Sequence, residues 1–181
     1  MVINGKTINL RTVDVSDADF IFNLRSSEVK SKYLTPISGN LQDQIKWILA
    51  YKEREIAEKE FYFVIETKEK KNLGLVRMYD FIDSAEQQGS ALSFSWGSWI
   101  ILSEAPKTTA IESAMQIYNF GFNERKFQKS HFSVRKENIN VVNFHLRFGA
   151  QIIKESSIDL FFIFTRDNYI SLLPKYSRFI K

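Results

Sequence analysis

The chain has no cysteine, and its 181 residues include only three prolines and seven glycines. Without cysteine, disulfides, thiolate metal sites and cysteine nucleophiles are all excluded. Two histidines are too few for a His-rich metal cluster, so we expect no metal. Proline, glycine and serine do not gather into linkers, and no internal repeat or low-complexity stretch interrupts the sequence.

Long apolar runs are also missing, and none approaches the ~18 residues that a membrane helix needs. Residues 1–10 lack the charged-then-apolar pattern of a secretory signal, so we expect a cytoplasmic protein with no membrane partner. The net charge is +4, but the basic residues are scattered among 21 acids. That distribution favours a small ligand bearing phosphate over a nucleic-acid partner.

The length suits one sizeable core and is too short for two ordinary enzymatic domains. With 44% hydrophobic and 25% charged residues, we expect a single domain over residues 1–181, with a core at about 6–166 and a tail at 167–181. The tail contains Leu172, Leu173, Tyr176, Phe179 and Ile180. It packs either on its own domain or on a second subunit, so a homodimer stays open.

Hydrophobic periodicity predicts the secondary structure. Strands are expected at 7–12, 61–65, 73–82, 91–102, 131–134, 151–154 and 160–165. Helices are expected at 16–25, 40–58, 107–123 and 138–148. Ser16 with Asp19, and Asn40 with Asp43, have the spacing of helix-start capping pairs, and Gly149 is placed to end the last helix.

The strand at 91–102 has an irregular pattern. Trp96 and Trp99 are three residues apart with Gly97 between them, so the large apolar face changes parity in the middle of the strand. One extra residue of a β-bulge would cause this change, and an ordinary glycine kink in a strand covered on both faces is the alternative.

The order of these elements and four local segments resemble the GNAT superfamily of acetyl-CoA-dependent N-acetyltransferases. The segments are residues 99–104 (WIILSE), 106–112 (PKTTAIE), 134–138 (VRKEN) and 144–150 (FHLRFGA). The resemblance covers about residues 6–165. It implies a mixed α/β fold, with a mostly antiparallel central sheet, two splayed neighbouring strands and flanking helices.

The resemblance also implies where acetyl-CoA binds. The pantetheine arm would pair with the backbone of Trp99, Ile100, Ile101 and Leu102, and Asn138 would hold it from the next helix. The pyrophosphate would lie at the helix start formed by Lys107, Thr108, Thr109 and Ala110, where free N–H groups favour an anion. Ala105, Thr108 and Ala110 align with this turn of the family, so its leading Arg or Gln and one glycine are absent.

Catalytic roles follow from the same comparison. His145 stands seven residues after Asn138, on the same helical face, where the family places a general acid for the departing thiolate. A hydrogen-bonded core histidine is the alternative, and His131 is expected to be structural. The amine must lose a proton, and Glu104, Asp80 or a water chain are the candidates for the base.

The acceptor pocket is expected between the first two helices, their loop and the three-stranded meander. Its candidate residues are Tyr33, Thr35, Trp47, Arg77, Tyr79 and Trp96. Aromatic faces with an arginine suit a sugar or nucleotide carrying phosphate; Trp47 with Tyr51 fits a core pair equally well.

The chain looks most similar to the GNAT branch that contains ribosomal-protein N-terminal and nucleotide-aminosugar acetyltransferases. We therefore predict acetyl transfer from acetyl-CoA to a small amine such as a nucleotide-linked aminosugar. A protein N-terminus as acceptor, a non-catalytic acyl-CoA-binding module and a basic nucleic-acid binder are the alternatives. The acceptor, the base and the oligomeric state are left open.

Overall fold

The computed structural model describes residues 1–27, 31–37, 39–82 and 92–179. Eight strands form one sheet in the order β1-β2-β3-β4-β5-β6-β8-β7. The elements are β1 (Val2–Asn4), β2 (Ile8–Thr12), α1 (Ala18–Ser26), α2 (Leu41–Ile56), β3 (Phe61–Thr67), β4 (Asn72–Ile82), β5 (Ser93–Ile101), α3 (Thr109–Asn119), β6 (Lys129–Arg135), α4 (Ile139–Arg147), β7 (Gln151–Glu155), β8 (Asp159–Thr165) and α5 (Arg166–Tyr176). Only β5 and β6 pair in parallel, and all other neighbours are antiparallel, which confirms the expected mixed, mostly antiparallel sheet.

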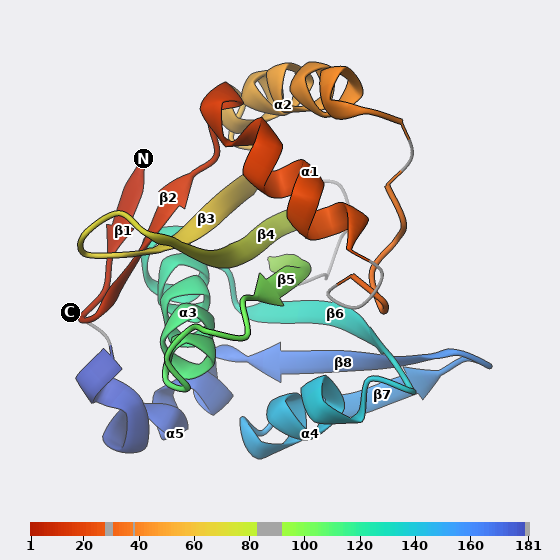
Figure 1. Cartoon of the computed structure of the whole chain (residues 1–181). Helices are drawn as coiled ribbons and strands as arrows, with labels where there is room; N and C mark the ends of the chain where they lie inside the picture. The colour runs from red at the N-terminus through yellow and green to blue at the C-terminus, as the bar shows by residue number, and fades with distance from the viewer. Residues whose placement is uncertain (28–30, 38, 83–91, 180–181) are drawn as a thin grey trace.

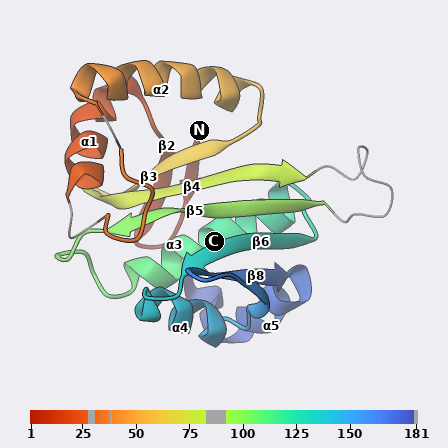
Figure 2. The ribbon, with the colours of Figure 1, turned by 90° about the vertical axis from the view of Figure 1, so that its right-hand side faces the viewer.

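Helices cover both faces of this sheet (Figures 1 and 2). α1 and α2 lie over one face, and α3, α4 and α5 lie under the other. Side chains of β3 alternate between the two faces. Phe61 and Phe63 join the core between the sheet and α3, whereas Tyr62 and Val64 join the core between the sheet and the helices α1 and α2. None of the helices in the described part of the chain is both long and apolar enough to cross a membrane.

The helix starts show where local sequence rules succeed. Asn40 accepts hydrogen bonds from the N–H groups of Gln42 and Asp43 at the start of α2, and Asp43 bonds back to the Asn40 N–H, as predicted. The predicted Ser16–Asp19 pair at the first helix is wrong.

Asp14 and Asp17 form the capping box of the first helix instead, around a 3-10 turn at Val15–Asp17 that precedes α1. The Asp14 side chain accepts from the N–H of Val15 at 2.6 Å, and Asp17 accepts from the N–H of Asp14 at 2.8 Å. Carboxylates at a helix start are favoured by the dipole as well as by the free N–H groups, so they outcompete Ser16.

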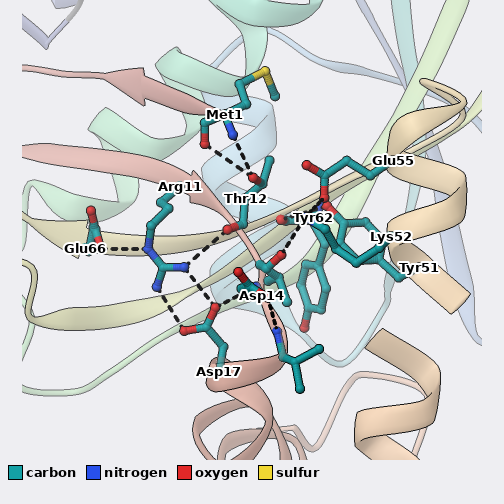
Figure 3. A network of polar contacts seen from close by, with 12 residues as sticks. Met1, Arg11, Thr12, Asp14, Asp17, Tyr51, Lys52, Glu55, Tyr62 and Glu66 are labelled. Atoms are coloured by element: carbon teal, nitrogen blue, oxygen red, sulfur yellow. Dashed lines mark hydrogen bonds and ion pairs between the residues drawn. The ribbon is translucent and has the colours of Figure 1, made fainter. Parts of the chain in front are cut away.

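A polar network ties this helix start to the sheet (Figure 3). The Arg11 guanidinium donates to both carboxylate oxygens of Asp17 at 2.9 Å and to Glu66 on β3 at 3.0 Å. Its bonds to Asp17, and then to Glu66, raise the pKa of Arg11 above its ordinary value despite partial burial. The network fixes the end of β2 and the first turn of α1, which carries one wall of the site described below.

One strand that was not predicted and two predicted segments need comment. β1 was not predicted, because three residues are too few for periodicity to register. The sequence also predicts a turn at 83–89, between the strands at 73–82 and 91–102, and this turn lies outside the described residues. The predicted helix at 107–123 is α3 followed by a π-helical turn at Phe120–Glu124.

The tail packs on its own chain. Tyr169 and Tyr176 of α5 and Phe179 beyond it are buried in the core beneath α3. Tyr169 also donates to the Asn119 side chain at the end of α3, at 2.9 Å. This packing removes the argument that the tail gave for a homodimer.

Candidate active site

The two parallel strands in the middle of the sheet separate after a short common stretch. β5 and β6 pair only at Ser93–Lys129 and Phe94–Ser130 within the described chain, although both strands continue well beyond these pairs. β6 meanwhile pairs with β8 along its whole length. The part of β5 beyond Phe94 therefore presents backbone N–H and C=O groups toward the opening, where they need a partner if buried.

A bulge in β5 lies beside this opening. Arg77 of β4 faces Gly97, but Leu75, two positions back, faces Ile100, three positions on, so β5 carries one extra residue. Ser98 takes up this residue with a φ of 47°, a conformation that is uncommon for residues other than glycine. The rings of Trp96 and Trp99 consequently meet on one face, 5.2 Å apart, as the change of parity predicted.

A cavity of about 870 Å³ lies on the α1/α2 face of the sheet, beside the opening. α1, the segment after it, α2 and the strands β3, β4, β5, β6 and β8 all contribute to its lining. Tyr33, Arg77 and Tyr79, all predicted to bind the acceptor, line it, and so do Thr35 and Trp47. Sequence reasoning missed Arg25 and Arg135. Arginines at the ends of helices and strands are usually solvated, and only the fold brings these two together.

The charge in the cavity is mainly that of three arginines. Arg77 bonds Glu60, and its guanidinium lies 4.9 Å from the Tyr79 ring centroid and 5.4 Å from that of Trp47. Arg25 donates to the Thr35 carbonyl at 2.7 Å. In both residues the Nε atom is buried without a hydrogen-bond partner among the described residues, which leaves an unused donor.

The third arginine and the two acids of the cavity are already paired. Arg135 donates to Asp159 at 3.3 Å. Asp43 accepts the Asn40 N–H in the capping box of α2 and lies 3.7 Å from Lys46. The acids therefore offer little free negative charge to a cationic ligand, and the arginines outnumber them in the lining, which favours an anionic ligand.

Trp96, also predicted to bind the acceptor, lies on the other face of the sheet. Its side chain is buried between Tyr118 of α3, Phe132 of β6 and His145 of α4. Strand alternation places it opposite Ser95 and Gly97, which face the cavity side. We therefore do not keep Trp96 among the acceptor-binding residues.

His145 occupies an apolar cage of aromatic rings on that same face, with Phe132 at 4.3 Å between centroids and Trp96 at 5.3 Å. Only 3% of the residue is exposed, and its Nδ1 has no hydrogen-bond partner among the described residues. Desolvation by this burial lowers the pKa of His145 to about 3. The imidazole is therefore neutral at pH 7, and the imidazolium that the predicted acid role requires is disfavoured.

The other predicted residues lie near the opening or outside it. Trp99, Ile100 and Ile101 belong to the part of β5 that pairs with β4 but not with β6, and the Leu102 N–H is already bonded to the Leu73 carbonyl at 2.8 Å. Glu104 is exposed and accepts a bond from Ser103 at 3.2 Å; it does not line the cavity.

The start of α3 keeps unused polar groups. Lys107 and Thr108 are exposed just before the helix, and Ala110 lies in its first turn. Thr109 is fully buried, and its hydroxyl has no partner in the described part of the chain. At the start of α4, Asn138 stands at the N-cap position, yet its side chain makes no capping bond. Lys107, Thr108 and Asn138 therefore lie where a ligand along the opening could contact them, whereas the Thr109 side chain is closed off from it.

Comparison with known proteins decides the family. A sequence profile described as an acetyltransferase (GNAT) domain matches residues 7–151. The chain belongs to the GNAT acetyltransferase family. It is therefore an N-acetyltransferase, and its family uses acetyl-CoA as the acetyl donor.

Solved structures similar to this acetyltransferase include one described as apo FdhC, a nucleotide-linked sugar GNAT. It is 37% identical, aligns over 100% of this chain and 99% of its own, and has a TM-score of 0.88. The spermidine N-acetyltransferase of Vibrio cholerae, solved with CoA and spermine, is 20% identical over 91% of this chain and 98% of its own, with a TM-score of 0.73.

A third structure, the ribosomal-protein-S5-alanine acetyltransferase of Vibrio fischeri, is 14% identical over 93% of this chain and 98% of its own, with a TM-score of 0.75. At this level of identity, it and the spermidine enzyme show a shared fold alone. No curated protein sequence matches the acetyltransferase significantly.

Proposed function

We propose that this enzyme transfers the acetyl group of acetyl-CoA to the amine of a nucleotide-linked aminosugar. The observation that carries the proposal is the cavity, in which three arginines outnumber two acids and the rings of Trp47 and Tyr79 lie beside Arg77. A diphosphate accepts several charge-assisted hydrogen bonds, and a base or sugar ring stacks on aromatic faces. The likeness to a structure described as a nucleotide-linked sugar GNAT supports the same acceptor class.

The same cavity argues against the other acceptors. A polyamine or a protein N-terminus carries positive charge, so its pocket needs free carboxylates. Asp43 and Asp159, which line this cavity, are engaged with a helix start and with Arg135. The cavity is therefore not the acid-lined groove that would favour a peptide acceptor.

The donor fits the opening between β5 and β6. The backbone of Trp99, Ile100 and Ile101 would bind the pantetheine arm as a neighbouring strand would, and Asn138 would bond its amides. The first turn of α3, with its free N–H groups and the exposed Lys107 and Thr108, would hold the pyrophosphate.

In this arrangement the amine approaches from the cavity face, and a backbone N–H of β5 near Ile100 would stabilise the oxyanion. A cytoplasmic location, expected from the sequence, is part of the same proposal.

An acceptor panel tests the proposal. Release of CoA thiol is measured with a nucleotide-linked aminosugar, the free aminosugar, spermidine and a peptide with a free N-terminus. We expect the nucleotide-linked sugar to have the highest kcat/KM, at least about tenfold above the free sugar, because only it reaches the arginines. Equal rates with and without the nucleotide, or a preference for the peptide, would rule the acceptor class out.

Arg77→Gln sharpens this test. The variant removes one charged donor worth about 1.5–3 kcal/mol, so the KM for the nucleotide-linked sugar should rise about ten- to a hundredfold. The buried Glu60 keeps its bond to Arg54 at 3.2 Å, which protects the fold. Turnover of the free aminosugar should stay unchanged and serves as the control; an equal loss with both acceptors would mean that Arg77 is structural.

A further inference from the structure

Three polar side chains from three strands meet where β5 and β6 begin to separate. His131 of β6 is the first residue beyond the last pair, Phe94–Ser130. Its Nδ1 lies 2.6 Å from the Ser93 hydroxyl of β5, and its Nε2 lies 3.1 Å from the Asp80 carboxylate of β4. A histidine held between a hydroxyl and a carboxylate is a common arrangement for moving protons.

A second bulge brings Asp80 to this place. Tyr79 faces Ser95 and Ile82 faces Ser93, so three steps along β4 match two along β5. Asp80 lies within the irregular stretch, with a φ of 53°. Aspartate tolerates the left-handed conformation better than most residues, and bulges re-aim side chains in this way. The left-handed backbone at Asp80 directs its carboxylate to His131, and this contact accounts for the strain.

His131 faces the cavity side of the sheet. Residues two apart on a strand share a face, and Ser133 and Arg135, which follow His131 at this spacing, both line the cavity. Ser133 is about 7 Å further along the strand. His131 itself is not among the residues that line the cavity, but its side chain keeps 23% of its surface exposed, so water can reach it.

Both nitrogens of this ring have a hydrogen-bond partner. The Asp80 carboxylate accepts the N–H of Nε2, which leaves the lone pair of Nδ1 toward the Ser93 hydroxyl. When Nδ1 takes up a proton, the Ser93 hydroxyl turns from donor to acceptor, and both N–H groups of the imidazolium stay bonded. Among the described residues, the charged groups on this side are Asp80 and Arg77 on β4, Lys129 and Arg135 on β6, Asp159 on β8, Arg25 on α1 and Asp43 on α2.

We propose that His131, oriented by Asp80 and Ser93, accepts the proton that the substrate ammonium must lose before it attacks acetyl-CoA. No residue of β5 is a carboxylate, and His131 follows directly after the last pair between β5 and β6, so it is the base that the fold places at the separation of the strands. The proposal rests on acetyl transfer to an amine and holds for whichever amine is the acceptor.

The step balances as follows. The ammonium gives one proton through water to Nδ1 of His131, and the amine lone pair forms the C–N bond to the thioester carbonyl carbon. The C–S bond then breaks, and the thiolate takes a second proton from the former amine nitrogen. The products are the amide and CoA thiol, and the proton on His131 passes to solvent.

His131→Gln tests the proposal through a pH–rate profile. At neutral pH we expect kcat/KM for the amine to fall about a hundredfold, because general-base catalysis contributes about 10²–10⁴. The loss should shrink as the pH rises, since the amine then loses its proton unaided. Binding of acetyl-CoA, measured by calorimetry, should stay unchanged.

Asp80→Asn gives a second, conservative test. Asparagine also adopts positive φ, so the bulge is kept while the carboxylate that holds the imidazolium is lost. We expect a rate loss of about tenfold or more at neutral pH, which shrinks as the pH rises, because the imidazole is no longer oriented by the carboxylate. Asp167→Asn on the exposed start of α5 is the matched control and should leave the profile unchanged.

Wild-type rates and an unchanged pH profile in both His131→Gln and Asp80→Asn overturn the proposal. If His131→Gln does not fold, the profile of Asp80→Asn decides alone. An enzyme that acetylates a different amine would contradict the proposed acceptor, and the same variants would then be measured with that amine.

Discussion

His145 and His131 lie on opposite faces of the sheet and in opposite surroundings. His145 is enclosed by aromatic rings with no carboxylate beside it, whereas His131 is partly exposed and bonded to Asp80. Spacing from Asn138 singled out His145, but spacing along a helix does not reveal how deeply a side chain is buried. The signal for His131 was absent from the sequence, because its partners come from strands that are far apart in the chain.

His145→Phe should make stability less sensitive to acid. The folded protein keeps His145 neutral down to about pH 3, whereas the unfolded chain protonates it below about 6.5. The unfolded state therefore binds the extra proton, and stability falls as the pH drops from about 6.5 toward 3, by up to about 1.4 kcal/mol per unit. Phenylalanine removes this contribution, so urea midpoints between pH 4.5 and 7.5 should vary less than in the wild type.

Equal slopes in the two proteins would contradict the buried, neutral state. The same variant also tests the acid role assigned from the sequence. If turnover falls while acetyl-CoA binding persists, that role is restored.

At the level of elements, bulges in two adjacent strands build the site. The one in β5 was predictable, because two tryptophans three apart cannot both stay on one face of a regular strand. The one in β4 was not, because Tyr79, Asp80 and Phe81 show no comparable break in pattern. The helix starts show the same contrast. The sequence predicted Asn40 correctly as the capping residue of α2, but it predicted Ser16 where Asp14 caps the first helix.

Ser98 tests the bulge in β5. Ser98→Gly should stabilise the fold slightly or leave it unchanged, because glycine adopts a φ of 47° without steric cost. Ser98→Val should destabilise it by about 1–3 kcal/mol and weaken acetyl-CoA binding, because a β-branched residue resists this conformation. Chemical unfolding and calorimetry measure both effects. A valine variant as stable as the glycine variant, with the same affinity, would show that the bulge does not depend on Ser98.

On the scale of the whole molecule, the sheet consists of β1 to β5 on one side and β6 to β8 on the other, joined by a short ladder. Side chains from both parts share the core beneath α3, which includes Phe94 and Phe132. Packing rather than strand pairing therefore holds the two parts together. Periodicity predicted most of the helices and strands, and the resemblance predicted the flanked sheet and the separation, but the lining of the cavity required the folded chain.

Acetyl-CoA should raise the unfolding temperature of the whole domain. A ligand at a hundred times its Kd stabilises the native state by about 2.7 kcal/mol, which amounts to about 5–10 °C for a protein of this size. Asn138→Ala should reduce the shift, because it removes the side-chain partner at the start of α4. Differential scanning calorimetry with acetyl-CoA measures it; an identical shift in wild type and Asn138→Ala would exclude Asn138 from the donor site.

The brevity of the ladder between β5 and β6 has a kinetic consequence. Acetyl-CoA in the opening between these strands would be bound along its pantetheine arm, and this arm is the same before and after the reaction. Spent coenzyme should thus occupy the gap nearly as well as fresh donor and compete with it. The rate inside a cell would then follow the ratio of acetylated to free coenzyme, rather than the concentration of the donor alone.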